Sequence, residues 1–243
     1  FYDRLEKMAP KIPTTAQPSA GIFAELYRQL GSTNDEIMSI HISSGLSGTI
    51  DSARLGIQNV PHRIIHLVDA MTLSGGERFQ VLAAAFAARA GKSKEFVLDR
   101  LAKIRESTEV VYTLETLEYL QRGGRIGRVQ ALAGMLLKIK PIIHVDKKDG
   151  KYTTLGKERT VPKALETITE HITEKYGNQV PLWVTVLHGR FAEQADRLAT
   201  MMREKVNVAK LEILRISPVL GVHTGPGIVG LAVVPMELME GLE

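Results

Sequence analysis

The sequence predicts an α/β protein of two domains, and three observations lead to that prediction. Strand and helix patterns alternate along the first half of the chain, which is typical of a mostly parallel sheet flanked by helices. The second half contains a strong hairpin signal, so its sheet is expected to be mixed or antiparallel. The length of 243 residues leaves room for two cores. We place the N-terminal domain at residues 1–109 and the C-terminal domain at residues 110–243, with a ligand site at their junction.

The first half shows strand and helix patterns in turn. Phe23, Leu26 and Leu30 recur at steps of three or four residues, and Gly31 follows, which predicts a helix that ends there. Ser93 stands where an N-cap residue is expected, just before an apolar helical stripe. In all, helices are predicted at residues 19–30, 51–56, 76–90 and 93–106, and strands at residues 37–42 and 63–68.

The second half is predicted to contain a hairpin. Asp149 and Gly150 lie between two β-rich runs and supply the backbone conformation that a tight turn needs. Thr160, followed by Pro162, marks the start of a helix. Strands are predicted at residues 109–113, 142–146, 151–155, 183–187, 211–216 and 228–234, helical pieces within 114–138, a helix that ends near 206, and a rigid glycine-rich loop at 221–227.

The composition argues against several classes of protein. The chain has no cysteine, which rules out disulfides and thiolate metal sites and fits a cytoplasmic location. Its net charge is +4, but acidic residues are interleaved with the basic ones and only 5% of residues are aromatic, so no nucleic-acid partner is expected. No apolar run is long enough to span a membrane, and the seven histidines form no H-E-x-x-H motif or comparable ligand pair. We therefore expect no stable membrane insertion, no metal and no cofactor.

A cluster of hydroxyl groups follows the first predicted strand. The carboxyl ends of strands are where open α/β sheets bind ligands, and the next helix would add a partial positive charge there. Glycines in the cluster allow backbone N–H groups to approach an anion. The cluster therefore predicts an anion cradle, whereas the alternative is a tight turn with capping serines. Its members are Ser43, Ser44, Ser47 and Thr49, with Gly45 and Gly48 between them.

Two other interpretations of these residues remain open. Ser47, Asp69 and His223 occur in the chain order of an α/β-hydrolase triad, but Gly48 directly follows the serine, which does not fit the nucleophile elbow. A small-anion or phosphate binder would use the same loop without an apolar tunnel.

The densest basic segment, residues 122–128, contains Arg125 and has two interpretations. It would suit phosphate or an acidic partner, or it is a solvated loop. Arg159 similarly stands at the end of the predicted hairpin, where a surface position is expected.

Five motifs together resemble the DegV family across nearly the whole chain. They are residues 14–19 (Thr-Thr-Ala-Gln-Pro-Ser), 42–49 (Ile-Ser-Ser-Gly-Leu-Ser-Gly-Thr), 117–126 (Leu-Glu-Tyr-Leu-Gln-Arg-Gly-Gly-Arg-Ile), 137–142 (Leu-Lys-Ile-Lys-Pro-Ile) and 223–227 (His-Thr-Gly-Pro-Gly). The resemblance implies a two-domain fold that holds a long-chain fatty acid at the domain junction. By motif, its carboxylate would be bound by Thr15, Ser47 and His223, with Ser43, Ser44, Gly48 and Thr49 in support.

The resemblance also implies a partner. Related proteins are fatty-acid-binding subunits of bacterial fatty acid kinase, which present the carboxylate to a separate ATP-dependent kinase subunit. The chain would then be a lipid-binding protein without catalytic residues of its own, which fits the absence of a Walker-type loop. Arg125 and Arg159 become candidates for covering the head group or contacting the kinase.

The sequence departs from the family pattern in two places. Ala16 stands where the family usually has a serine, which removes one hydroxyl next to Thr15. The strand that usually opens the family's fold is not found before Phe1: either that stretch has been cut away or this is a divergent member, and a missing strand would leave a sheet edge exposed.

Overall fold

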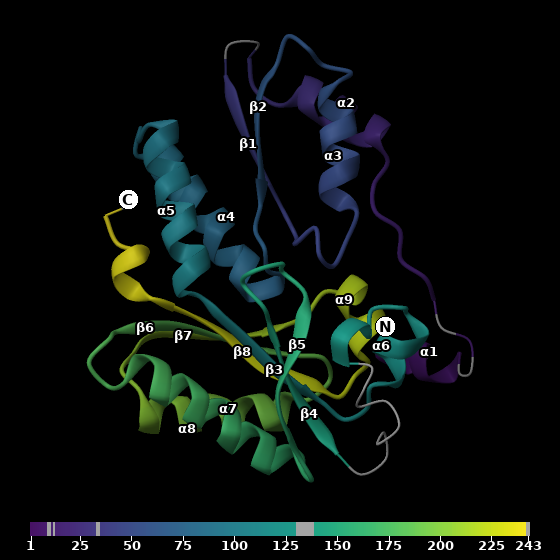
Figure 1. Ribbon diagram of the computed structural model, residues 1–243, viewed down its shortest axis with the longest axis vertical. Coiled ribbons are helices and arrows are strands. Elements are labelled where there is room, and N and C mark those ends of the chain that lie inside the picture. The colour runs from purple at the N-terminus through teal and green to yellow at the C-terminus, as the bar shows by residue number, and fades with distance from the viewer. Residues whose placement is uncertain (9–10, 12, 33–34, 130–138, 242–243) are drawn as a thin grey trace.

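A computed structural model describes residues 1–8, 11, 13–32, 35–129 and 139–241. The strands form two separate sheets (Figure 1). The smaller sheet pairs β1 (Glu36–His41) with β2 (Ile64–Asp69) in parallel. Two helices, α2 (Ala20–Gln29) and α3 (Thr49–Ile57), pack against each other beside this sheet.

The larger sheet has six strands in the order β5-β4-β3-β8-β6-β7. Its neighbouring strands are antiparallel except for the parallel pair β6 and β7. The six are β3 (Glu109–Leu114), β4 (Lys140–Val145), β5 (Tyr152–Glu158), β6 (Leu182–His188), β7 (Val208–Arg215) and β8 (Ile228–Pro235).

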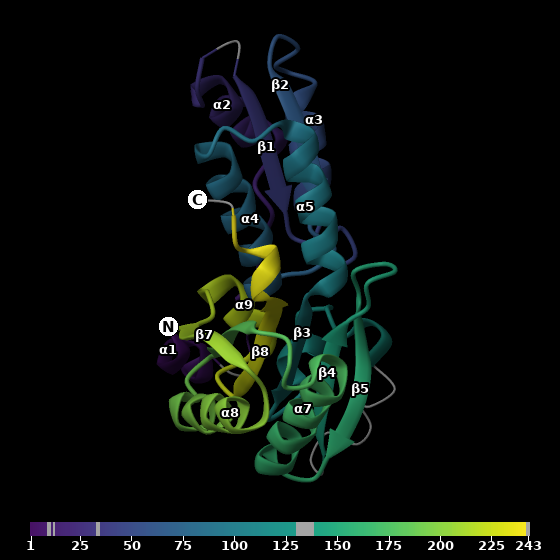
Figure 2. The ribbon, with the colours of Figure 1, turned by 90° about the vertical axis from the view of Figure 1, so that its left-hand side faces the viewer.

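Helices cover both faces of the larger sheet. One face carries α7 (Val161–Tyr176) and α8 (Ala192–Lys205), and the opposite face carries α4 (Ser74–Arg89) and α5 (Lys94–Ser107) (Figure 2). The shorter helices are α1 (Tyr2–Lys7), α6 (Glu118–Arg122), α9 (Pro218–Thr224) and a 3₁₀ turn at Met236–Leu238.

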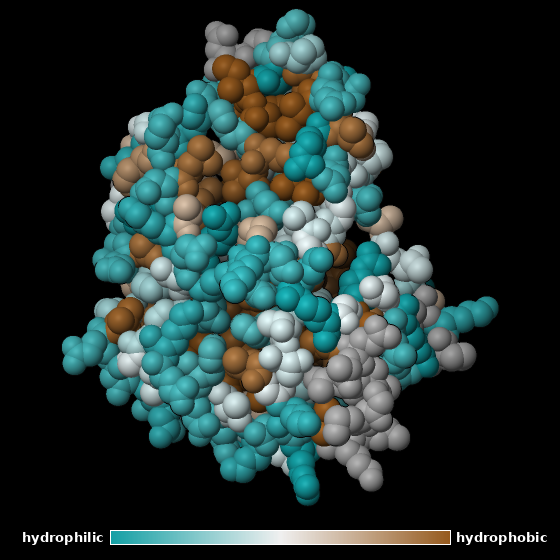
Figure 3. Space-filling view, in the orientation of Figure 1, coloured by the Kyte–Doolittle hydropathy of each residue, from teal (hydrophilic) through white to brown (hydrophobic). Residues whose placement is uncertain are grey.

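Each face of the larger sheet has its own hydrophobic core. On the α4 side, the rings of Phe79 and Trp183 meet edge to face with centroids 5.5 Å apart. On the α7 side, Leu165 and Ile168 are fully buried against the sheet. By contrast, Ile64 at the start of β2 is 49% exposed, and apolar side chains gather on the surface where β1 and β2 lie (Figure 3).

Helix α1 is held beside α9, although more than 200 residues separate them. Arg190 binds the carboxylates of Asp3 and Glu6, at 2.5 and 2.8 Å. Gly221 in α9 leaves room for the rings of Phe1 and Tyr2, which a side chain there would displace. The N-terminal helix therefore supports the helix that carries His223 (Figure 1).

The predicted fold class is confirmed, with a small parallel sheet and a larger mixed sheet flanked by helices. Ser93 and Thr160 accept the expected N-cap hydrogen bonds, and Gly150 takes a φ of +65° in the hairpin turn. One local prediction was wrong: Pro218–Thr224 is helical, so His223 lies on a helix and the rigid turn is confined to residues 225–227. The predicted domain boundary falls at the start of β3, and part of the predicted helical stretch 114–138 lies outside the described residues.

Candidate functional site

Thr15 and His223 form the centre of the candidate site. Thr15 lies on the extended segment 13–19, which connects α1 to α2, and its Oγ1 is 2.7 Å from Nε2 of His223. Burial lowers the pKa of His223, and the nearby positive charge of Arg125 lowers it further. The imidazole is therefore neutral at pH 7, so it provides one N–H donor and one acceptor.

The turn that follows α6 packs directly against the imidazole of His223. A Cβ atom at Gly123 would overlap with Nδ1 of His223, so only glycine lets the imidazole take this position. Nδ1 is buried and has no hydrogen-bond partner among the described residues. Arg125 donates from Nη1 to the carbonyl oxygen of Gly123 at 2.8 Å, which ties its guanidinium to the same turn.

The carboxylate of Asp69, at the end of β2, holds the loop after β1 through hydrogen bonds. It accepts hydrogen bonds from the backbone N–H groups of Ser44, at 3.2 Å, and Met71, at 2.8 Å. Ser43 is fully buried, and its hydroxyl accepts from the N–H of Gly45 at 3.1 Å. Ser43 is thus engaged in the loop itself, while Ser44 is exposed.

Ser47 can donate its hydroxyl hydrogen to a ligand when the Thr49 hydroxyl is the donor in the bond between the two. Its Oγ accepts from the backbone N–H of Thr49 at 3.2 Å and lies 2.8 Å from the hydroxyl of Thr49. When Thr49 donates both bonds, the acceptor capacity of Ser47 is filled and its own O–H is free. Such a donor suits an anionic group better than an acceptor does.

Gln17 connects the Thr15 segment to the Ser47 loop and was not predicted as a site residue. A Cβ at Gly48 would lie 3.0 Å from Nε2 of Gln17, so the amide packs directly on the loop. The only signal in the sequence was the position of Gln17 inside the motif at residues 14–19. Contact through Gln17 places Thr15 and Ser47 on neighbouring segments of the same site.

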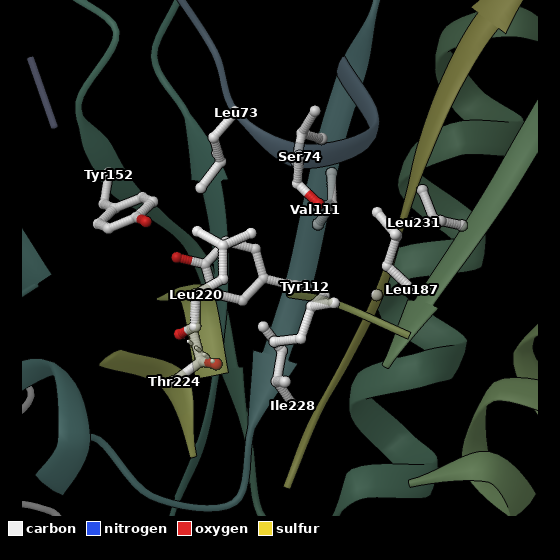
Figure 4. A pocket seen from close by; sticks show the side chains of 13 residues that line it. Leu73, Ser74, Val111, Tyr112, Tyr152, Leu187, Leu220, Thr224, Ile228 and Leu231 are labelled. Carbon is white, nitrogen blue, oxygen red and sulfur yellow. Dashed lines mark hydrogen bonds between the residues drawn. The ribbon is translucent and has the colours of Figure 1, made fainter. Parts of the chain in front are cut away.

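A narrow apolar cavity of about 30 Å³ lies beside α9, the helix that carries His223 (Figure 4). It is bordered by α9, by the start of α4 and by strands of the larger sheet. Its lining includes Leu220 and Thr224, which flank His223 on α9. The full lining is Leu73, Ser74, Val110, Val111, Tyr112, Tyr152, Leu187, Ile216, Leu220, Thr224, Ile228, Gly230 and Leu231.

A basic groove of about 300 Å³ lies on the other side of Tyr152, which lines both spaces. The loop after β1 contributes Gly45 and Leu46 to the groove, and the segment after α6 contributes Gly124, Arg125, Gly127 and Arg128. Arg128 is paired with Asp149 at 2.5 Å. Arg125 and Lys151, in contrast, form no ion pair with a carboxylate in the part of the chain that the structure describes.

The hydrolase arrangement is not formed by the described residues. His223 bonds to Thr15 rather than to Ser47, and Asp69 bonds to backbone N–H groups of the loop rather than to His223. Arg159 follows the last residue of β5 and is exposed. No group of three or more metal-ligating acids and histidines occurs among the described residues, and none of their helices is long and apolar enough to cross a membrane.

Fold and site together define an α/β protein in which a polar loop at the carboxyl end of β1 borders a basic groove, and Tyr152 separates that groove from an apolar cavity of the larger sheet. The sequence matches a family profile described as "uncharacterised protein, DegV family" over residues 1–236. The chain belongs to the DegV family. A DegV domain-containing protein of Deinococcus radiodurans is 39% identical over 235 residues, which cover 97% of this chain and 81% of that protein.

Two solved structures of similar fold are described as fatty-acid-binding proteins. One is a DegV family protein from Thermus thermophilus, with a TM-score of 0.89 and 31% identity over 96% of this chain and 83% of that one. The other is DegV from Bacillus subtilis, with a TM-score of 0.84 and 31% identity over 97% of this chain and 83% of that one.

Proposed function

We propose that this protein binds a long-chain fatty acid, with the carboxylate at the Thr15, Ser47 and His223 side chains and the alkyl tail in the apolar cavity. The observation that carries the proposal is the position of the Thr15–His223 hydrogen bond, one residue along α9 from the cavity-lining Thr224. An amphipathic ligand needs this combination of polar and apolar surfaces in contact. The fatty-acid binding described for similar structures supports the same ligand class.

The chemistry of the two surfaces suits the two ends of a fatty acid. When Nε2 of His223 carries the proton and donates to Thr15, the hydroxyl hydrogen of Thr15 is free for the carboxylate, as is that of Ser47. Neutral donors of this kind satisfy an anion without placing a second buried charge beside it. Tail burial then supplies most of the affinity, at about 0.8 kcal/mol per methylene group.

The proposal extends to presentation of the fatty acid to a separate ATP-dependent kinase. The chain has no phosphate-binding loop of the Walker type, so ATP would have to be bound by a partner. The basic groove adjoins the head-group side of the site and offers Arg125 without a carboxylate partner among the described residues. Arg159 is exposed and free of an assigned structural role, which suits a partner contact.

Mass spectrometry of the organic extract from freshly purified protein tests ligand binding. The wild-type chain is expected to carry a stoichiometric fatty acid, and the Ser47→Ala/His223→Ala double variant to lose it. A matched control is His62→Ala/Thr200→Ala, which removes an exposed imidazole and an exposed hydroxyl away from the cavity. An empty wild-type protein that also takes up no added oleate would rule out the proposal.

A second experiment tests the kinase step by itself. The lipid-loaded chain is incubated with a purified fatty acid kinase subunit and ATP, and acyl phosphate is trapped with hydroxylamine. Arg125→Ala and Arg159→Ala are expected to lower transfer while the protein still retains lipid. If the wild-type chain binds fatty acid but no acyl phosphate forms, fatty-acid binding stands and presentation to a kinase of this type does not.

A further inference from the structure

The apolar cavity contains two tyrosine hydroxyls that lack an acceptor for one of their hydrogens among the described residues. Tyr112 on β3 and Tyr152 on β5 meet edge to face, with ring centroids 5.8 Å apart and an interplanar angle of 80°. They are 6% and 7% exposed, and Figure 4 shows both side chains pointing into the cavity. The Tyr112 hydroxyl is buried and has no partner within ordinary hydrogen-bond distance and angle limits among the described residues. The Tyr152 hydroxyl is close enough to act on it, and even when one of the two donates to the other, one hydroxyl hydrogen of the pair is left without an acceptor.

An unpaired hydroxyl is unfavourable in a cavity that takes only hydrocarbon. A ligand oxygen that accepts the free hydroxyl hydrogen is favoured over plain hydrocarbon by about tenfold or more, whereas a phenylalanine would fill the same space without needing an acceptor. Burial raises the pKa of Tyr112 well above its ordinary value and that of Tyr152 to about 12. Both side chains are therefore neutral hydrogen-bond donors at physiological pH.

The two hydroxyl groups lie at the head-group end of the cavity. Tyr152 separates the cavity from the basic groove that contains Arg125, and the charge of Arg125 acts on both Tyr152 and His223. Thr224, which lines the cavity beside Tyr112, directly follows His223 in α9 (Figure 4). A fatty acid held by Thr15 and His223 would therefore pass the tyrosines with the first carbons after its carboxylate.

We propose that Tyr112 and Tyr152 are specificity-determining residues that select an acyl chain with a hydroxyl oxygen near the carboxylate, as in a 3-hydroxy fatty acid. Such an oxygen accepts the hydroxyl hydrogen that the tyrosine pair leaves without an acceptor. The site of this interaction differs from the carboxylate contacts of Thr15, Ser47 and His223. The inference rests on the proposed fatty-acid binding and names the substrate class of the same site.

Competition binding on the delipidated full-length chain tests the inference. The competing acids are hexadecanoate, 3-hydroxyhexadecanoate and 16-hydroxyhexadecanoate, measured on the wild type and on Tyr112→Phe, Tyr152→Phe and the double variant. The wild type is expected to prefer the 3-hydroxy acid over hexadecanoate by about tenfold, with no such gain for the 16-hydroxy acid. The double variant is expected to lose the preference and to bind hexadecanoate as well as or better than the wild type does.

The control is Tyr176→Phe, which deletes a hydroxyl that donates to the carbonyl oxygen of Ser107, outside the cavity. It is expected to keep the wild-type preference, and a thermal melt establishes that each variant is folded. Equal affinity of the wild type for hexadecanoate and its 3-hydroxy form overturns the inference and leaves fatty-acid binding intact. Equal weakening of all three acids by Tyr→Phe also overturns it, because the hydroxyls would then serve the carboxylate. Failure of every acid to bind overturns the proposed function as well.

Discussion

Thr15 and His223 are 208 positions apart in the sequence, and a hydrogen bond of 2.7 Å joins their side chains. One residue lies on an extended connection and the other on a short helix, so the bond exists only when α1, α9 and the segment between α1 and α2 are assembled. The pair is therefore a product of the tertiary structure. Measuring fatty-acid affinity and protein stability on the same variants separates the proposed role of this pair in carboxylate binding from its role in folding.

Thr15 and His223 are expected to act on fatty-acid affinity as a coupled pair. A double-mutant cycle with Thr15→Val, His223→Ala and both together should give a coupling energy of about 0.5–3 kcal/mol in fatty-acid binding, because each single change already removes the shared hydrogen bond. The measurement is titration calorimetry with oleate on delipidated protein. Additive losses would show that the two residues contact the ligand independently or not at all.

Gly123→Ala is expected to reduce fatty-acid binding while the protein still folds. The backbone at Gly123 has φ −75° and ψ −5°, which alanine adopts readily, but the new methyl group would displace the imidazole of His223. The loss is measured as lipid content by mass spectrometry together with the melting temperature.

Gly21→Ala is the control for Gly123→Ala. The nearest atom to a Cβ there is Oγ of Ser19, 3.8 Å away, so the added methyl group causes no clash. A wild-type lipid content in Gly123→Ala would contradict the conclusion that the position of the His223 imidazole against Gly123 is needed for fatty-acid binding.

Local signals were sufficient for most of the fold. Ser93 and Thr160 cap helices through bonds to backbone N–H groups three residues away, so each cap is encoded within a few positions. The hairpin at Gly150 is similarly local. Helix α9 was not predicted because Gly221 and Gly225 favour a loop. A helix start signal was nevertheless present, with Ser217 as N-cap followed by Pro218.

The candidate site was predicted in part, through motifs, and its remainder depends on contacts that no local pattern contains. Tyr112 looks in the sequence like an ordinary residue of a buried strand, and only its position in the cavity shows that its hydroxyl lacks an acceptor of ordinary geometry among the described residues. Gln17 is identified by its packing on Gly48. Glu77 looks like a normal acidic residue in the first turn of a helix, but folding buries most of it.

Glu77 is expected to make stability depend on pH in the neutral range. Burial raises its pKa to about 7 from 4.5, the nearby backbone N–H of Ile42 opposes this shift, and the charge of Asp69 adds to it. Because the folded-state pKa is raised, the stability contribution is fully present below 4.5 and is lost as pH rises to about 7. The full shift corresponds to about 3 kcal/mol.

Denaturant unfolding of the wild type and Glu77→Gln between pH 5 and pH 8 measures this effect. The free energy of unfolding of the wild type is expected to fall by about 2–3 kcal/mol relative to the variant over that range. Histidines titrate in both proteins, so their contribution cancels in the comparison. Glu193→Gln, on the exposed face of α8, should follow the wild type. Parallel curves for the wild type and Glu77→Gln would mean that Glu77 is ionised in the folded protein.

Glu109 is expected to show the opposite pH dependence. Its side chain is 6% exposed at the start of β3 and contacts Lys175, Lys147 at 3.1 Å and His171 at 3.5 Å. Burial alone would raise the pKa of Glu109, but the bonds to His171 and Lys175 and the charge of Lys147 hold it well below its ordinary value. The stability contribution of the carboxylate is therefore present above pH 4.5 and is lost as pH falls.

Glu109→Gln should destabilise the protein by about 3–5 kcal/mol at pH 7, because it leaves the partly buried ammonium groups of Lys147 and Lys175 without a counter-charge. Denaturant unfolding at pH 7 and pH 3 measures both effects, and the difference between wild type and variant should shrink at the lower pH. Glu170→Gln is the control, since Glu170 is exposed on α7 beside the same cluster. A variant as stable as the wild type at pH 7 would mean that desolvation of the carboxylate and its partners cancels their attraction, so that the cluster orients α7 on β3 without stabilising it.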